Sequence, residues 1–298
     1  MTQEISKPDQ NVPSPRKFKV TFKQLRRYPI FPMFILSVML FLGIFGPTLA
    51  PHDPERANIR QLRVPPVWIE GGSFDNVLGT DEVGRDVFSR VMHGARISLM
   101  VAGVSVTVGF LAGTSLGLIS GYYGGYVDEI IMRIVDVWNA LPFLMVALVA
   151  VIIFQPSVQL VLVLLALIAW AGFVRVVRAQ VLTLRGLEYV QHARVSGART
   201  RRIIWRHIFP GVINTAIVVA TLNVGGLILA EASLSFLGAG IPRPTPAWGL
   251  MVADGKDWLT SAWWISVFPG IAIFLTVMSL NFMGDWMRDR FDPRLRQL

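Results

Sequence analysis

Five stretches of this chain contain no Asp, Glu, Lys or Arg, and each is long enough to cross a lipid bilayer. They are residues 28–52, 97–127, 137–174, 207–230 and 258–284. A spanning helix needs about 20 mostly apolar residues, because the hydrocarbon layer is about 30 Å thick and an α-helix rises about 1.5 Å per residue. The composition agrees, with 53% hydrophobic and only 16% charged residues. The sequence therefore predicts an all-α integral membrane protein.

The number of crossings follows from the lengths of these stretches. The stretch 137–174 is too long for one helix and is interrupted at 155–157, so we expect two helices joined by a tight turn. The stretch 207–230 continues past Glu231 to about Gly240. The total is six transmembrane helices. The first one could instead be a signal peptide, but its apolar run is longer than the usual 7–15 residues, which favours an uncleaved span.

Charge fixes the orientation of these helices. Residues 1–30 carry seven Lys and Arg against two acidic residues, and residues 175–210 carry eight Arg against one Glu. Residues 285–298 have a smaller basic excess of four against three, whereas residues 51–96 have six basic and seven acidic side chains. Cytoplasmic segments of membrane proteins collect Lys and Arg. With six spans the three basic segments share one side, so both termini and the stretch 175–210 are predicted to be cytoplasmic.

The residues that an enzyme would need do not form a recognisable set. The four histidines have no metal-binding spacing, there is no GxSxG sequence, and the chain has no cysteine for a nucleophile or a thiolate metal site. The closest approach to a phosphate-binding loop is 249–257, whose glycine spacing is one residue too long. Catalysis within this polypeptide is therefore not expected, and no metal or cofactor is assigned to it.

Several features inside the membrane remain to be explained. Glu231 lies in an apolar segment, where a carboxylate is either functional or a structural partner of a neighbouring helix, and the sequence favours neither. Arg133 and Asp136 are spaced to pair along one helix face. Pro142 is expected to kink the third span. Glycines at 121, 124 and 125 predict a turn, and those within spans predict close helix packing: Gly43, Gly46, Gly103, Gly109, Gly113, Gly117, Gly225 and Gly226.

The basic cytoplasmic stretch predicts two short helices. One covers 188–196 and ends at Gly197, because glycine readily takes the left-handed conformation that stops a helix. The other covers 198–209 and ends at Pro210, with Arg199, Arg202 and Arg206 on one face and Ile204 and Ile208 opposite. Such an element could lie on anionic lipid headgroups, or it could dock a soluble partner.

This stretch and four other segments together resemble one family of membrane proteins. The loop is similar to the Glu-Ala-Ala…Gly…Leu-Pro motif of ABC-importer permeases, with Gln191, His192 and Ala193 at the first three positions and Phe209 and Pro210 at the last two. Four more segments resemble the dipeptide/oligopeptide/nickel permeases, of the second-permease type: "LGTDEVGRDVFSRVMHGARISL" (78–99), "GYYGGYVDEIIMRIVD" (121–136), "EASLSFLGAGIPRPTPAWG" (231–249) and "GDWMRDRFDPRL" (284–295).

The resemblance implies a type I ABC-importer permease fold and a transport function. Such a permease pairs with a second, homologous permease in the cell inner membrane to form a translocation path. Two ATPase subunits, which hydrolyse the ATP, bind the cytoplasmic loops, and an extracytoplasmic binding protein delivers the substrate. Peptides are the expected substrate class, with nickel or another small solute as the alternative. The alternative functions from a different class are an intramembrane enzyme and a stand-alone channel.

The resemblance also assigns roles to residues and segments. The expected ATPase-docking residues are Glu188, Tyr189, Gln191, His192, Ala193, Gly197, Ala198, Arg202, Phe209 and Pro210, and the candidate translocation-path residues are Glu231, Ser233 and Ser235. The expected layout is a cytoplasmic tail (1–30), a first transmembrane helix (31–50), an extracytoplasmic segment (51–95), a five-helix core (96–287) with a coupling loop at 181–211, and a cytoplasmic tail (288–298).

Overall fold

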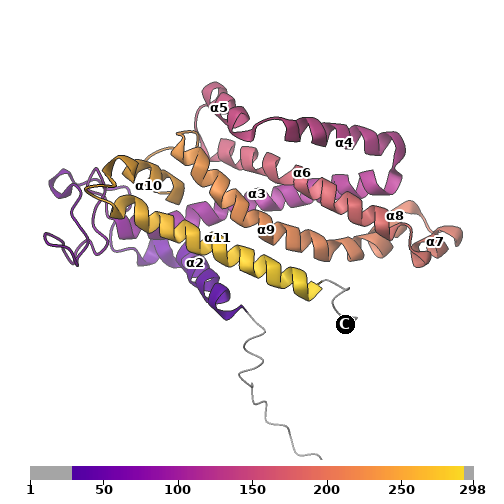
Figure 1. The fold of residues 1–298 in the computed structure, drawn as a ribbon, viewed down its shortest axis with the longest axis horizontal. Helices are drawn as coiled ribbons and strands as arrows, with labels where there is room; N and C mark the ends of the chain where they lie inside the picture. The colour runs from indigo at the N-terminus through magenta and orange to yellow at the C-terminus, as the bar shows by residue number, and fades with distance from the viewer. Residues whose placement is uncertain (1–28, 292–298) are drawn as a thin grey trace, which may run out of the picture.

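The computed structural model describes residues 29–291, and the regular elements in that range are helices, with one isolated β-bridge between Thr80 and Asp86. The long helices run side by side along the molecule, with α7 and α8 at one end and α10 with the loop 50–86 at the other (Figure 1). We call these the α7–α8 end and the α10 end. The helices are α2 (Ile30–Leu49), α3 (Val87–Tyr123), α4 (Gly125–Ala140), α5 (Phe143–Phe154), α6 (Val158–Leu184), α7 (Glu188–Val195), α8 (Thr200–Ile203), α9 (Phe209–Phe236), α10 (Trp248–Gly255) and α11 (Trp264–Phe291).

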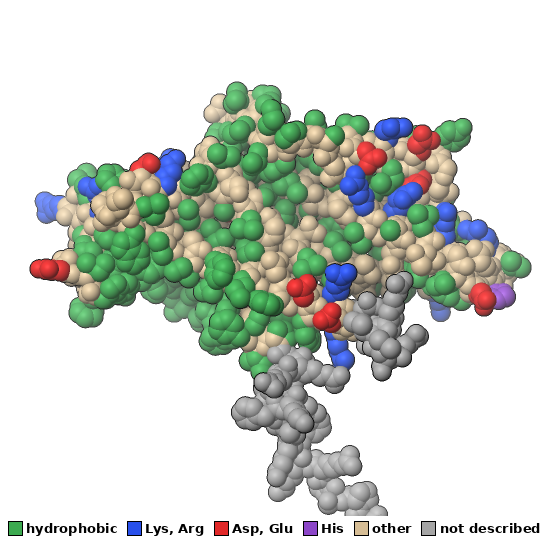
Figure 2. Space-filling model, viewed as in Figure 1, with side chains coloured by type: hydrophobic (Ala, Val, Ile, Leu, Met, Phe, Trp, Pro, Cys, Tyr) green, Lys and Arg blue, Asp and Glu red, His purple; other side chains and the backbone are tan. Residues whose placement is uncertain are grey.

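The helix lengths fit the predicted membrane topology. Five helices are long and apolar enough to cross a membrane: α2, α3, α6, the continuous helix 200–236 and α11. The pair α4 and α5 would make a sixth crossing, bent by 83°. Hydrophobic side chains cover the middle of the molecule, whereas charged side chains gather toward the two ends and near the C-terminal end of α11 (Figure 2). The predicted tight turn at 155–157 is confirmed, because α5 ends at Phe154 and Ser157 caps α6.

Helix α3 begins ten residues before the charge-free stretch that predicted it. The Asp86 side chain accepts a hydrogen bond from the backbone N–H of Ser89 over 2.8 Å and so caps the helix. Arg90, inside this extension, is buried and pairs with Asp81 and Asp254. A paired charge does not exclude a residue from a buried helix, so the charge-free stretch underestimated the length of α3.

Pro142 has a larger effect than the expected kink. Leu141 is extended, with ψ 128°, and Pro142 precedes the first residue of α5, so the segment is two separate helices. Proline disfavours helical geometry in the residue before it and cannot donate a backbone hydrogen bond. The predicted pairing of Asp136 with Arg133 is wrong: Asp136 accepts a 2.7 Å hydrogen bond from Arg175 on α6.

Glycines line the most extensive helix contact, between α3 and α6. Gly109, Gly113, Gly117 and Gly121 recur every four residues, so they form one stripe along α3. A Cβ atom at Gly113 would lie 2.4 Å from the carbonyl oxygen of Trp170, and a Cβ at each of the other three glycines would lie 2.4, 2.8 or 2.7 Å from an atom of α6. The predicted packing role is confirmed for Gly109, Gly113, Gly117 and Gly46, but at Gly103 and Gly226 such a Cβ would meet no other described segment within 4 Å. Gly121 was predicted to form a turn, and that prediction is wrong because Gly121 lies inside α3.

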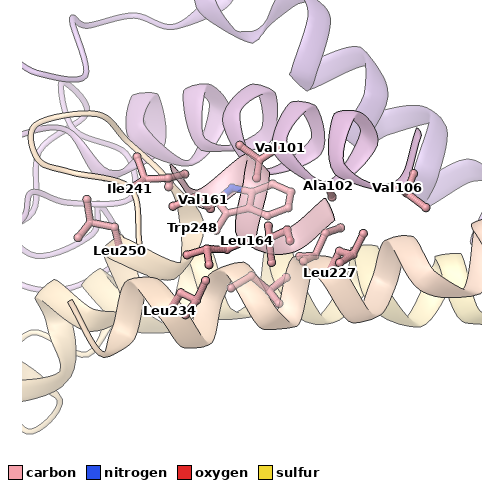
Figure 3. Packing of buried hydrophobic residues seen from close by; sticks show 14 of the residues in the cluster. Val101, Ala102, Val106, Val161, Leu164, Leu227, Leu234, Ile241, Trp248 and Leu250 are labelled. Atoms are coloured by element: carbon pink, nitrogen blue, oxygen red, sulfur yellow. The ribbon is translucent and has the colours of Figure 1, made fainter. Parts of the chain in front are cut away.

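The core at the α10 end is built around Trp248, which lies outside the charge-free stretches. Residues 248–255 form α10, packed against α9 and α11. The Trp248 side chain is fully buried; its Nε1 donates to the carbonyl oxygen of Val91 over 2.9 Å. Side chains from three long helices surround the ring (Figure 3). An eight-residue apolar segment has too little periodicity to reveal a helix by itself.

Candidate functional site

The loop between α6 and α9 forms a compact projection at the α7–α8 end. Helix α7 ends as predicted at Gly197, whose φ of +76° is the left-handed conformation. The N–H of Gly197 donates to the carbonyl of Arg194 and the N–H of Ala198 donates to that of Ala193, both over 3.0 Å. These two bonds are the Schellman arrangement that closes a helix C-terminus. The bend between the two short helices therefore has a defined shape.

Pro210 does not end the second helix, contrary to the prediction. Helix α8 passes through a π-helical segment, Ile204–Ile208, into α9, and Pro210 lies in the first turn of α9. A π turn widens the hydrogen-bond ring, so the missing N–H and the bulky ring of proline are accommodated. The second short helix and the α9 crossing are consequently one continuous helix from Thr200 to Phe236.

Apolar side chains attach this projection to the transmembrane helices. Val190, Ile203 and Ile208 are buried in a cluster with residues of α3, α6 and α9. The predicted apolar face is thus present and Ile208 is buried as expected, but the second fully buried residue is Ile203, whereas Ile204 is half-buried. The projection is held by packing and is not a flexible linker.

The outward surface of the projection is basic. Arg199, Arg202 and His207 line an open hollow of about 610 Å³ together with Ala193, Ser196, Gly197 and Ala198. An adjacent hollow of about 470 Å³ is lined by arginines around Trp205, which is 57% exposed. Exposed arginines beside an exposed aromatic ring and a fixed backbone bend are typical of protein-binding surfaces.

The remaining expected docking residues divide between surface and interior. Glu188 and His192 are exposed, whereas Phe209 is half-buried against the apolar cluster. The Tyr189 hydroxyl donates to the carbonyl oxygen of His207 over 3.1 Å and so joins α7 to the π segment. Gln191 donates through Nε2 to the carbonyl oxygen of Arg185 over 2.8 Å. The loop therefore has its own internal hydrogen bonds.

The three candidate path residues do not lie on one surface. Glu231 and Ser235 are buried, and the Ser235 hydroxyl donates to Glu231 Oε1 over 2.7 Å. Ser98 on α3 is a second hydroxyl that interacts with this carboxyl group, while Oε2 has no hydrogen-bond partner among the described residues. Ser233 points elsewhere, into an open groove of about 430 Å³ between α9, α10 and α11.

This groove continues along the outside of α9 and α11. Its second part, about 740 Å³, is apolar except for Asn281 and Asp285. Asn281 is exposed within the apolar helix α11, where contact with lipid would leave its amide without hydrogen-bond partners. This α9–α11 face is therefore a better candidate for a surface covered by protein or water than for one covered by lipid.

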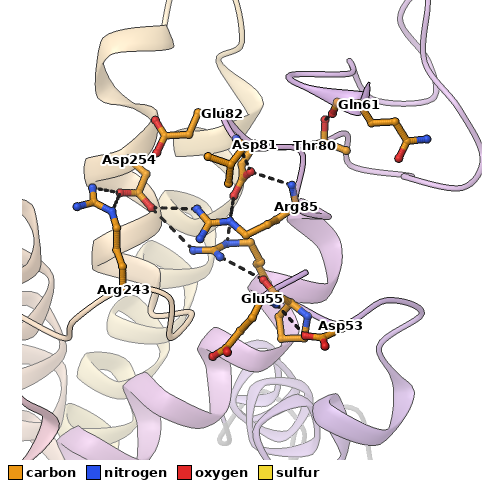
Figure 4. A network of polar contacts seen from close by, with 12 residues as sticks. Asp53, Glu55, Gln61, Thr80, Asp81, Glu82, Arg85, Arg243 and Asp254 are labelled. Carbon is orange, nitrogen blue, oxygen red and sulfur yellow. Dashed lines mark hydrogen bonds and ion pairs between the residues drawn. The ribbon is translucent and has the colours of Figure 1, made fainter. Parts of the chain in front are cut away.

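Buried charges, which the sequence did not single out, join the loop 50–86 to α3 and α10 (Figure 4). Asp81 accepts a 2.6 Å hydrogen bond from Nε of Arg85 and lies 3.5 Å from Nε of Arg90. Asp254 on α10 lies 3.7 Å from Arg85 and 3.8 Å from Arg90, and it also pairs with Arg243. The signal that could have revealed them is the presence of Arg85 just before α3 and of Arg90 in its first turn.

Comparison with known proteins identifies the family. Residues 113–297 match the family described as "Binding-protein-dependent transport system inner membrane component". The chain is 47% identical over 260 residues to the dipeptide transport system permease protein DppC of Escherichia coli, covering 87% of each chain. It is 39% identical to the di/tripeptide permease DppC of Pseudomonas aeruginosa (89% of this chain, 87% of the relative) and 39% identical to the glutathione permease GsiD of Pectobacterium atrosepticum (89% and 86%).

Solved structures agree on the fold. An inward-facing MetNI methionine ABC transporter superposes with a TM-score of 0.54 at 18% identity, covering 66% of this chain and 93% of that one. An amino acid ABC transporter gives 0.53 at 15% identity, covering 68% and 94%. This chain therefore belongs to the binding-protein-dependent transport system inner membrane components, the multi-pass permease subunits of ABC importers whose ATP is hydrolysed by partner subunits.

Proposed function

We propose that this chain forms half of a translocation path for di- or oligopeptides, with a second, homologous permease as the other half. The relatives at 39–47% identity are named as permeases for dipeptides, di- and tripeptides, and glutathione, and these names favour peptides over nickel or another small solute. Two ATPase subunits and an extracytoplasmic binding protein complete the assembly. The α9–α11 face, with Ser233 and Asn281, is the surface that we assign to the path or to the partner permease.

The α7–Gly197–α8 projection is the proposed docking element for an ATPase subunit. The single observation that carries this assignment is the shape of the projection, which is rigid, exposed and basic and continues into a transmembrane helix. By the positive-inside rule this end is cytoplasmic and the α10 end is extracytoplasmic. In this layout the residues 51–86 and α10 lie on the extracytoplasmic side, whereas the predicted tails 1–30 and 288–298 fall largely outside the described residues.

Transport then follows as a shift between two populated conformations. ATP binding closes the ATPase pair and moves the docked projections, and the spans change from inward-open to outward-open. The continuous helix 200–236 carries that movement from α8 directly into α9, because the π segment interrupts neither the backbone nor the packing. Hydrolysis of ATP returns the assembly to its first state.

Co-purification with the ATPases tests the docking assignment. Gly197→Glu and Ala193→Glu should remove the ATPases from the purified complex. Gly125→Glu is the matched control, because Gly125 also has a positive φ (+52°) and, like Gly197, has no atom within 4 Å of an added Cβ. If the ATPases remain bound to the Gly197→Glu variant, the docking assignment is wrong.

Uptake of a radiolabelled dipeptide, alanyl-alanine, tests the substrate class. Cells that lack their own peptide permeases should accumulate it when this chain, its partner permease, the ATPases and the binding protein are all expressed. Accumulation of ⁶³Ni²⁺ without accumulation of the dipeptide would favour the nickel alternative. ATP-independent accumulation would favour a channel.

A further inference from the structure

The position at which this loop departs from the family motif has a specific contact in the structure. Gln191 stands where the motif has glutamate, and its Nε2 donates to the carbonyl oxygen of Arg185, the residue that caps the C-terminus of α6. An ionised glutamate only accepts hydrogen bonds, so at this position its oxygens would face another acceptor. The amide is therefore required for this contact.

Arg185 carries the connection from α7 to α3. Its Nη1 donates to the carbonyl oxygen of Gly121 over 2.9 Å and to that of Tyr122 over 3.4 Å. These carbonyls are in the last turn of α3, where no following helical N–H is available. A Cβ atom at Gly124 would lie 3.3 Å from the same Nη1, so the glycine leaves the space that the guanidinium occupies.

A second contact reaches the same point of α3 from α7 itself. The guanidinium carbon of Arg194 lies 5.8 Å from the centre of the Tyr122 ring, within the range of a cation–π interaction. Two side chains of the loop region thus contact Tyr122: Arg185 at its carbonyl oxygen and Arg194 at its ring. The end of α3 is in turn tied to α4 and α6, because Asp128 accepts hydrogen bonds from Arg178 and from Ser120, each over 2.5 Å.

We propose that Gln191, Arg185 and Arg194 are positioning residues that hold α7 against the C-terminal end of α3, so that movement of the docked projection reaches α3 as well as α9. The inference rests on the proposed docking of α7 and α8 to an ATPase. Movement of the projection would then be transmitted by two routes. One is the continuous helix into α9, and the other is this polar contact with α3. Because the glycine stripe packs α3 closely against α6, movement of α3 also moves α6.

The test compares two glutamine substitutions in the full importer, reconstituted in proteoliposomes with its partner permease, ATPases and binding protein. Gln191→Glu replaces the donor with an acceptor. Gln180→Glu is the matched control, since Gln180 lies on α6 and none of the hydrogen bonds of the described residues involves its side chain. The readout is the ratio of ATPase rate with binding protein and alanyl-alanine to the basal rate.

Loss of one hydrogen bond corresponds to about a 3- to 10-fold change in an equilibrium constant. The stimulated-to-basal ratio should therefore fall about 3- to 10-fold in Gln191→Glu and stay unchanged in Gln180→Glu, with the ATPases still co-purifying. Arg194→Gln should lower the ratio, and Arg194→Lys should restore it, because lysine keeps a cation for Tyr122.

Three outcomes overturn the inference. An unchanged ratio in Gln191→Glu would show that the contact does not transmit movement. Loss of the ATPases from Gln191→Glu would mean that Gln191 acts in docking, as the family resemblance implied, and not as a positioning residue. Absence of the ATPases from the unsubstituted complex would contradict the docking assignment itself, and this inference would fall with it.

Discussion

The Ser235 hydroxyl donates to Oε1 of Glu231 across one turn of α9, and both side chains are buried inside the chain and not on its outer face. This contact distinguishes Glu231 from Ser233, which is two residues away and lines the α9–α11 groove. A buried carboxyl group held by hydroxyls is suited to joining α9 to α3, whereas a group on the groove can meet a solute or a partner.

Substitution of Glu231 distinguishes these roles. Glu231→Gln keeps the side-chain shape and an oxygen that can accept from Ser235, so the complex should assemble at a yield within about twofold of the unsubstituted one. Glu231→Ala leaves a cavity and unpaired hydroxyls, which costs about 1–3 kcal/mol or more, so its yield should fall clearly. Size-exclusion chromatography of the purified complex measures both.

Uptake provides the second readout for the same site. If Glu231→Gln assembles but lowers alanyl-alanine uptake, Glu231 acts in transport, as the candidate path assignment expects. If Glu231→Gln also prevents assembly, the carboxylate is a structural partner and the path assignment for this residue is wrong.

The glycine stripe of α3 gives a prediction about stability. Gly113→Ala places a Cβ 2.4 Å from a backbone oxygen of α6, which cannot move without displacing the helix. Overpacking of this kind costs about 1–3 kcal/mol, so the thermal unfolding temperature in detergent should fall by several degrees. Gly103→Ala, on the same helix with open space around it, should leave the temperature unchanged or slightly raised. Equal effects at the two positions would contradict the packing assignment.

The buried charges at the α10 end give another prediction about stability. Asp254→Asn removes a negative charge that pairs with Arg85, Arg90 and Arg243. The two buried arginines would then share the single negative charge of Asp81. Breaking a buried ion pair costs about 3–5 kcal/mol, so the variant should unfold at a clearly lower temperature. Asp257→Asn is the control, because Asp257 is exposed three residues away and takes part in none of the ion pairs among the described residues. A similar loss in both variants would point to a general effect of charge.

The absence of cysteine from the sequence makes the orientation directly testable. Phe74 and Val195, each 86% exposed, lie at the α10 end and the α7–α8 end. Phe74→Cys should react with a membrane-impermeant maleimide added outside right-side-out vesicles, whereas Val195→Cys should react only after the membrane is opened. The reverse pattern would contradict the cytoplasmic placement of α7 and α8.

Much of this molecule was predictable because the bilayer imposes a length and a polarity on every crossing. The charge-free stretches predicted the long helices and the turn before Val158, and Gly197 predicted the end of α7. The five matching segments indicated the family. The resemblance also pointed to Gln191 as a departure from the motif, but the partner of that amide lies on another helix end and could not be read from the loop alone.

The remaining features depend on contacts between segments distant in the chain. The sequence by itself determined which stretches can lie in lipid and which side collects arginine, because both follow from the local cost of burying charge. Only the tertiary structure decided that Asp136 pairs with Arg175, that Trp248 is buried at the α10 end, and that Glu231 faces inward while Ser233 faces the groove. These outcomes depend on how the helices rotate and pack against one another, and the sequence of a single helix does not specify which residues of another helix it will contact.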